Sequence, residues 1–133
     1  MWRWKDFSPK EVLSPMGLRV WADKEILMVR PEAMDKLQAF REDLGIPLFV
    51  NHLGLTLRGY RHYDEHRVLH KGAKFSQHVQ GCAFDVSSNQ IEPLALYEQA
   101  LDFGWTGVGL YDTFVHMDIR CGPRATWSER LRR

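Results

Sequence analysis

Apolar residues recur with helical spacing in two segments of the chain. The first lies between Pro31 and Gly45, and its apolar positions are Ala33, Leu37, Phe40 and Leu44. The second lies between Glu92 and Gly104, and its apolar positions are Leu94, Tyr97 and Leu101. Steps of three and four residues place side chains on one face of an α-helix, and a glycine after the last apolar position is typical of a helix end. The pattern therefore predicts two amphipathic helices.

A short helix is predicted near the start of the chain. Residues 8–11 read S-P-K-E, which combines a serine cap, a proline at the first helical position and an early acidic residue. We expect Ser14-Pro15 and Gly17 to stop this helix, because proline and glycine interrupt regular structure.

Five further segments are predicted to be extended. They are residues 46–51 (I-P-L-F-V-N), 53–61 (L-G-L-T-L-R-G-Y-R, with a turn or bulge at Gly59), 82–87, 107–110 and 113–120. The last two form a predicted hairpin around Tyr111-Asp112, and a polar loop is expected from His62 to Phe75. Because helices come first and strands follow with one helix inserted, the order predicts an α+β fold with a small, mostly antiparallel sheet flanked by helices.

Length, charge and cysteine content limit the class of protein. The chain has 133 residues, of which 44% are hydrophobic and 26% charged, as expected for a single globular domain over residues 1–133. We expect an N-terminal extension over about residues 1–29 and a core over about 30–127. A net charge of +1 argues against a nucleic-acid partner. The two cysteines, Cys82 and Cys121, are too few for a disulfide framework, and two reduced thiols are favoured over a bond between them.

The sequence shows no targeting or membrane signal. No window approaches the roughly 20 apolar residues of a membrane span. Residues 1–10 (M-W-R-W-K-D-F-S-P-K) lack the apolar stretch of a secretory signal peptide. We therefore expect cytoplasmic synthesis.

Three potential metal ligands stand in two short motifs. His78 and Asp85 occur in S-Q-H-V-Q-G-C-A-F-D (residues 76–85), and His116 occurs in F-V-H-M-D (residues 114–118). Two imidazoles and one carboxylate suit zinc and leave its fourth tetrahedral position open for water. Water bound to zinc ionises near neutral pH. The set predicts a hydrolytic metalloenzyme.

The predicted strand around His116 alternates between polar and apolar side chains. His116, Asp118 and Arg120 face one way, and the apolar residues between them face the other. The polar face either lies in solvent or lines a cleft that places Asp118 beside a metal-bound His116, and spacing alone leaves both open. In the other motif, Gly81 allows a sharp turn toward Asp85.

The run S-x-H-x-x-G-x-A-x-D, followed later by H-x-D, resembles the zinc D-alanyl-D-alanine carboxypeptidase family. That family belongs to the LAS group, which also holds lysostaphin-type peptidases and the hedgehog signalling domain. R-G-Y-R at residues 58–61 is similar to the family's S-G-Y-R segment, and residues 107–120 with Trp127 resemble its compact phage and bacterial branch. The resemblance covers about residues 30–127 and implies a hedgehog/DD-peptidase-like zinc fold.

The resemblance also implies roles for individual residues. The implied zinc ligands are His78, Asp85 and His116. Arg61 would anchor the substrate carboxylate or orient the scissile carbonyl, because a planar guanidinium matches a carboxylate and stays charged. Ser76 and Gln77 would line the entrance to the site, and Ser76 could instead hydrogen-bond a metal ligand.

The chain departs from the family pattern at the proton-transfer residue. Many members carry an acid three residues before the last histidine, where this chain has Thr113, and others carry a second histidine where this chain has Phe114. Asp118, on the His116 face of the strand, is the first candidate for the general base, and Asp112 in the flanking turn is the second. Either carboxylate could instead orient a ligand imidazole.

The sequence therefore predicts a zinc peptidase that hydrolyses an amide bond in bacterial cell-wall peptide, as a D,D-carboxypeptidase or a peptidoglycan endopeptidase. Two alternatives stay open: a zinc-containing binding module without hydrolysis, which Thr113 favours, and a phage tail-associated protein of the same fold. We expect a monomer that acts on peptidoglycan peptide and is released by lysis or carried by a phage particle. The bond that is cut depends on pocket contacts that motifs do not encode.

Overall fold

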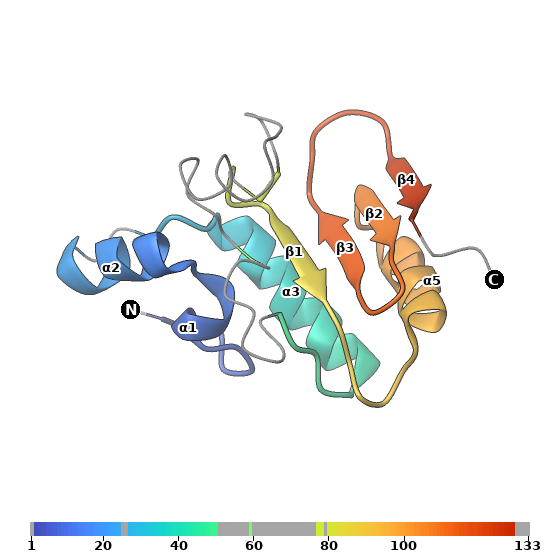
Figure 1. Cartoon of the computed structure of the whole chain (residues 1–133), viewed down its shortest axis with the longest axis horizontal. Helices are drawn as coiled ribbons and strands as arrows, with labels where there is room; N and C mark the ends of the chain where they lie inside the picture. Colours follow the sequence, from blue (N-terminus) through green and yellow to red (C-terminus); the bar gives the residue numbers. More distant parts are fainter. Residues whose placement is uncertain (1, 25–26, 51–58, 60–76, 79, 130–133) are drawn as a thin grey trace.

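The computed structural model describes residues 2–24, 27–50, 59, 77–78 and 80–129 of the chain. This part of the chain contains four helices and one four-stranded sheet, in the order α1, α2, α3, β1, α5, β2, β3, β4 (Figure 1). The predicted α+β class is confirmed. Within the same residues, no helix has both the length and the apolar character needed to cross a membrane.

Two short helices open the chain. α1 (Pro9–Val12) begins at the predicted cap, where the Ser8 N–H donates to the Glu11 carboxylate. The sequence Ser14-Pro15 ends α1, as predicted, but it also begins a helix that the pattern did not predict, α2 (Pro15–Lys24). The Ser14 hydroxyl accepts a hydrogen bond from the Gly17 N–H and thereby caps this helix.

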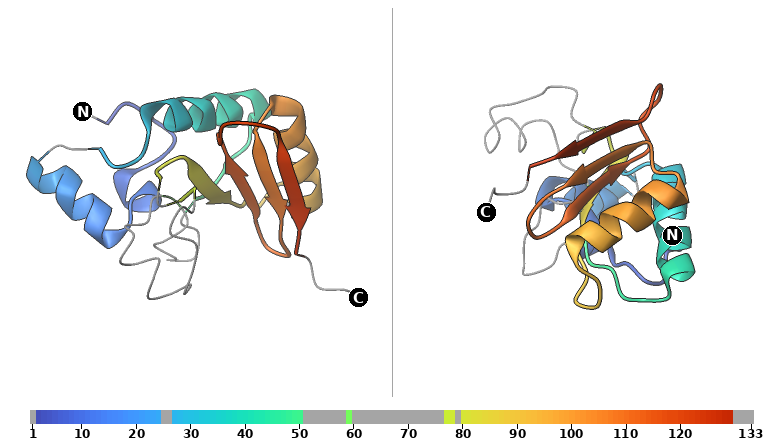
Figure 2. Two further views of the ribbon diagram at one scale, coloured as in Figure 1. Left: turned by 90° about the horizontal axis from the view of Figure 1, so that it is seen from above. Right: turned by 90° about the vertical axis from the view of Figure 1, so that its right-hand side faces the viewer.

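The two predicted amphipathic helices are present. They are α3 (Pro31–Leu44) and α5 (Pro93–Phe103), and each begins with a proline in its first turn. Each ends at a glycine with a left-handed backbone, Gly45 with φ 68° and Gly104 with φ 93°. Figure 2 shows both helices on the same side of the sheet.

The sheet is mixed. Its strands are β1 (Ala83–Val86), β2 (Gly107–Leu110), β3 (Val115–Asp118) and β4 (Ala125–Ser128), in the spatial order β1-β3-β2-β4. β3 pairs antiparallel with β2, as the predicted hairpin requires, and it also pairs antiparallel with β1, whereas β4 pairs parallel with β2. The sequence pattern did not predict β4.

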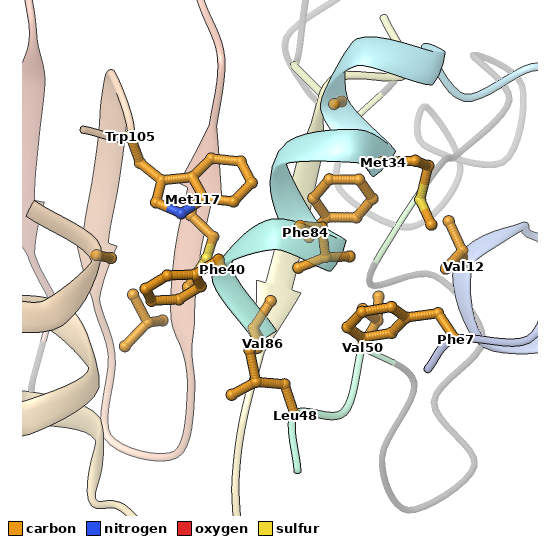
Figure 3. Close-up of a cluster of buried hydrophobic side chains, with 14 of the residues drawn as sticks. Phe7, Val12, Met34, Phe40, Leu48, Val50, Phe84, Val86, Trp105 and Met117 are labelled. Carbon is orange, nitrogen blue, oxygen red and sulfur yellow. The ribbon is translucent and has the colours of Figure 1, made fainter. Parts of the chain in front are cut away.

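The two faces of the sheet differ in character. On β1, β2 and β3, the face toward the helices carries only buried apolar side chains. They are Phe84, Val86, Val108, Leu110, Val115 and Met117. Phe40 of α3 packs against Trp105, and the core formed around them is shown in Figure 3. The opposite face holds a row that the register sets side by side across all four strands: Asp85, His116, Gly109 and Trp127.

The predicted strand over residues 46–51 is wrong for its described part. Phe49 makes one isolated antiparallel bridge to Ser87, and no ladder forms. Pro47 cannot donate to a ladder. The Val50 N–H donates instead to the Glu11 carboxylate at 3.0 Å. Asn51, the predicted extended segment 53–61 apart from Gly59, and the predicted loop 62–75 lie outside the described residues.

The two cysteines are both free thiols in different surroundings, which gives a chemical test of the fold. Cys82 is buried and Cys121 is exposed. Burial, and then the nearby Asp118 carboxylate, raises the pKa of the Cys82 thiol to about 11, and the reactive form of a cysteine is its thiolate. Treatment of the native protein with iodoacetamide near neutral pH should therefore alkylate Cys121 alone, and denaturant should expose both thiols. Alkylation of Cys82 in the native protein, read by peptide mass spectrometry, would contradict this fold.

Candidate metal centre

The three predicted ligands come together on the face of the sheet away from the helices. Asp85 of β1 pairs with His116 of β3, and the turn at Gly81 brings His78 back onto them. Gly81 has φ 74°, and a Cβ at this position would lie 2.4 Å from the Met28 carbonyl oxygen. The turn therefore needs a glycine both for its backbone angle and for space. With this turn in place, Asp85 Oδ1 lies 3.1 Å from His78 Nε2 and 3.2 Å from His116 Nδ1.

The cluster is compact and buried. One nitrogen or oxygen atom from each of the three residues lies within 4.8 Å of the other two, and all three side chains are buried. Among the described residues, this is the only group of three or more histidine, cysteine or acidic side chains placed to share a metal ion.

The far nitrogen of each imidazole has an acceptor of its own. His78 Nδ1 donates to the Gly59 carbonyl at 2.9 Å, and His116 Nε2 lies 2.7 Å from Asp118 Oδ2. When both rings are neutral, these protons leave the lone pairs of His78 Nε2 and His116 Nδ1 directed at Asp85. Histidines that bind metals are typically held in this way, because an outer acceptor fixes the tautomer and the ring orientation.

The charges in the cluster oppose the cost of burial. Burial alone would raise the pKa of Asp85, but the charge on His78 and hydrogen bonds from both imidazoles hold it well below its ordinary range. Burial alone would lower the pKa of His116, but its hydrogen bonds and charge interactions with Asp118 and Asp85 raise it. The carboxylates of Asp85 and Asp118 therefore favour a positive charge between them, at His116.

Asp118 lies behind His116 and is fully buried. Arg120 donates to it from its backbone N–H at 3.0 Å, from Nε at 2.9 Å and from Nη2 at 2.6 Å. Burial alone would raise the pKa of Asp118, but the hydrogen bonds from His116 and Arg120 hold it well below its ordinary range. Asp118 is thus an ionised carboxylate enclosed by one imidazole and one guanidinium.

Two glycines of β2 make room for this arrangement. A Cβ on Gly107 would lie 2.2 Å from Asp118 Oδ1, and a Cβ on Gly109 would lie 2.4 Å from two atoms of the Trp127 indole. The Trp127 ring in turn lies 5.0 Å from the His116 ring, centroid to centroid. The G-V-G pattern of β2 is the sequence signal for this arrangement, because glycine inside a strand often marks a close approach of this kind.

The remaining predicted site residues divide into two groups. Arg61 and Ser76 lie outside the described residues, so their roles stay predictions. Gln77 is half-buried, and its side-chain oxygen accepts a hydrogen bond from the Cys82 thiol at 2.8 Å. Asp112 is half-buried in the turn between β2 and β3, where the Tyr111 N–H donates to the Phe114 carbonyl at 3.1 Å.

The donor set fits a metal ion that accepts nitrogen and oxygen ligands. Two imidazole nitrogens and one ionised carboxylate oxygen converge from three chain positions, and both imidazoles are fixed from behind. Three protein ligands with an open fourth position are the pattern of catalytic zinc sites, whereas structural sites use four protein ligands. The arrangement could therefore hold a metal ion and still admit water or substrate.

The raised pKa of His116 gives a pH dependence for metal binding. A proton and a metal ion compete for the same imidazole, so binding weakens as pH falls below the pKa of His116 in the metal-free protein. Asp85 stays ionised over the same range and adds no pH dependence. The apparent zinc Kd should weaken by about tenfold per pH unit for each proton displaced, starting at a higher pH than for an ordinary histidine. Competition titrations with a chromophoric chelator measure this, and a Kd that stays constant from about pH 8 to pH 6 would contradict it.

Comparison with known proteins gives one match. A protein-family model described as Peptidase M15 matches residues 6–118, which includes all three members of the cluster and ends at Asp118. No curated protein and no solved structure matches the chain.

Proposed function

Because the chain belongs to the peptidase M15 family of zinc-dependent metallopeptidases, we propose that it hydrolyses an amide bond in bacterial cell-wall peptide. The observation that carries this proposal is the buried cluster of His78, Asp85 and His116, in which every ligand atom has a defined orientation. A D,D-carboxypeptidase and a peptidoglycan endopeptidase both fit this cluster.

The three residues of the cluster would hold zinc through His78 Nε2, Asp85 Oδ1 and His116 Nδ1. These are the atoms that face one another in the structure. Bound zinc supplies a Lewis acid that polarises the scissile carbonyl and activates water at neutral pH. The chain contributes a buried, preorganised ligand set, because its side chains are already oriented before the ion arrives.

We assign proton transfer to Asp112 in this proposal and a positioning role to Asp118. Asp118 lies on the Nε2 side of His116, and Asp85 lies on the Nδ1 side. The imidazole therefore separates the Asp118 carboxylate from the other two members of the cluster. Its two oxygens are also occupied by Arg120 and His116. A general base must reach the proton that it removes, directly or through one water. Asp112, in the half-buried turn of the hairpin that carries His116, is the other candidate carboxylate and takes that role in this proposal.

Arg61 would bind the charge of the substrate, and Ser76 and Gln77 would line the entrance. Their support is the similarity of their sequence segments to the family pattern. Gln77 is also the residue directly before the ligand His78 in the sequence.

Digestion of purified peptidoglycan with the zinc-loaded protein, followed by mass spectrometry, tests the proposed function. We expect new fragments that each carry a freed amine or carboxylate, and their masses identify the bond that is cut. The matched control is Asp85→Ala, which should release none of them. A wild-type protein that holds zinc but leaves every cell-wall peptide intact would instead support the non-catalytic binding module, which the threonine at position 113 already makes a defined alternative.

A further inference from the structure

We propose that Arg120 is a positioning residue that, together with Trp127, fixes the Asp118 carboxylate so that His116 presents Nδ1 to the metal. This inference rests on the proposed metal site but assigns residues that lie beyond it. Arg120 touches none of the three cluster residues in the contacts of the described chain; it acts through Asp118.

The hydrogen bonds from Arg120 to Asp118 have a defined geometry. Nε and Nη2 donate to different carboxylate oxygens, at 2.9 Å to Oδ1 and 2.6 Å to Oδ2, and the Arg120 backbone N–H adds a third bond to Oδ1. A two-pronged contact between guanidinium and carboxylate fixes the plane of the carboxylate as well as its charge. The Oδ2 atom held by Arg120 is the same atom that lies 2.7 Å from His116 Nε2.

The orientation of Asp118 therefore determines the orientation of His116. If the carboxylate could rotate, Oδ2 would leave the plane in which His116 Nε2 donates, and the ring would lose its outer acceptor. On the other side of the carboxylate lies Gly107 of β2, where any side chain would collide with both carboxylate oxygens, so the present position of Asp118 depends on a glycine there. Arg120 therefore holds the carboxylate against rotation, and Gly107 leaves the space that this orientation needs.

Trp127 holds Arg120 in place. The guanidinium carbon of Arg120 lies 5.2 Å from the centroid of the Trp127 ring, which is within the range of a cation–π contact. The Trp127 indole N–H donates to the Tyr111 hydroxyl at 3.0 Å, and Gly109 lets the ring lie close to β2. The ring also lies next to His116, so a single side chain of β4 contacts both ends of the Arg120–Asp118–His116 chain.

Both supporting residues lie after the segment that matches the family. The match ends at residue 118, whereas Arg120 follows β3 and Trp127 belongs to β4. The parallel pairing of β4 with β2 places Trp127 opposite Gly109 in the same row as His116. The segment after residue 118 therefore completes the support of the metal ligand.

The test compares Arg120→Ala, Arg120→Lys and the control Arg124→Ala in the full chain loaded with zinc. Arg124 is exposed and donates only to the Leu101 carbonyl in the described contacts, so its removal should change nothing. Two quantities are measured: the zinc Kd by competition titration, and the solvent exchange of the His116 Nε2 proton by nitrogen-15 NMR of labelled imidazoles. We expect Arg120→Ala to weaken zinc binding by about 10- to 100-fold, as for loss of other outer partners of a metal ligand, and to speed proton exchange by at least about tenfold.

Arg120→Lys separates position from charge, because lysine keeps the charge but cannot grip both oxygens. We expect the His116 Nε2 proton of this variant to exchange with solvent faster than in the wild type. If the His116 Nε2 proton exchanged at the wild-type rate in either Arg120 variant, the proposal would be overturned, even if zinc binding were weaker. If Arg120→Ala does not fold, Arg120→Lys decides by the same two measurements. A wild-type chain that binds no zinc would refute the proposed function instead, so the two failures are distinct.

Discussion

Asp85→Ala is expected to remove bound zinc from the protein and to reduce amide hydrolysis to the background rate. Asp85 Oδ1 is the atom that both imidazoles face, at 3.1 Å and 3.2 Å, and it supplies the only negative charge among the three ligands. Its loss should weaken zinc binding by more than the roughly 10- to 100-fold that follows loss of an outer partner. Zinc content by plasma mass spectrometry and hydrolysis of peptidoglycan fragments measure the two effects.

A matched control separates this effect from a general loss of acidic charge. Asp102 is an exposed aspartate on α5, and Asp102→Ala should keep both zinc and activity. Circular dichroism should show that both variants remain folded, because Asp85 is not part of the hydrophobic core and its substitution creates no clash. If Asp85→Ala retained about one zinc per chain with the wild-type Kd, the assignment of the metal site would be wrong.

Asp112→Asn and Asp118→Asn are expected to fail in different ways. Asp112→Asn should lower kcat by about 10²- to 10⁴-fold, the usual contribution of a general base, while zinc binding stays at the wild-type level. Asp118→Asn should weaken zinc binding by about 10- to 100-fold but approach the wild-type kcat at saturating zinc. The reason is that Asp118 contacts the far nitrogen of His116 and is enclosed by Arg120.

Steady-state kinetics over a range of zinc concentrations distinguishes the two carboxylates. The reverse result, a large fall in kcat for Asp118→Asn at saturating zinc with little change for Asp112→Asn, would return proton transfer to Asp118. Asp102→Asn provides the exposed control for the removal of one negative charge.

The sequence was most informative where a local pattern determines the local structure. The signals for α3 and α5 lie within or beside those helices, and the structure confirms that both helices exist. The predicted apolar face is confirmed for α3, whereas in α5 the buried positions are Leu96 and Ala100 and the predicted Leu94 is exposed. The alternation in β3 placed His116 and Asp118 on one face, and the register with β1 brings Asp85 beside His116. The convergence of His78 needed the glycine turn at residue 81, which the motif also contains.

The parts that the sequence did not reveal depend on contacts between distant segments. β4 is a short strand with an alternating half-buried and exposed pattern, and it forms through parallel pairing with β2 rather than through a hairpin. Residues 46–50 have strand-like composition, but the Val50 N–H goes to Glu11 of α1, 39 positions earlier. The role of Asp118 was also left open, because spacing along a strand does not tell on which side of the imidazole a carboxylate lies.

The most direct test of the metal site is a crystal structure of the zinc-loaded protein with anomalous data on both sides of the zinc absorption edge. We expect a single strong anomalous peak at about 2.0–2.2 Å from His78 Nε2, Asp85 Oδ1 and His116 Nδ1, with Asp118 still hydrogen-bonded to His116 Nε2. A peak bound by other residues, or by His116 through Nε2, would contradict the assignment of this metal site.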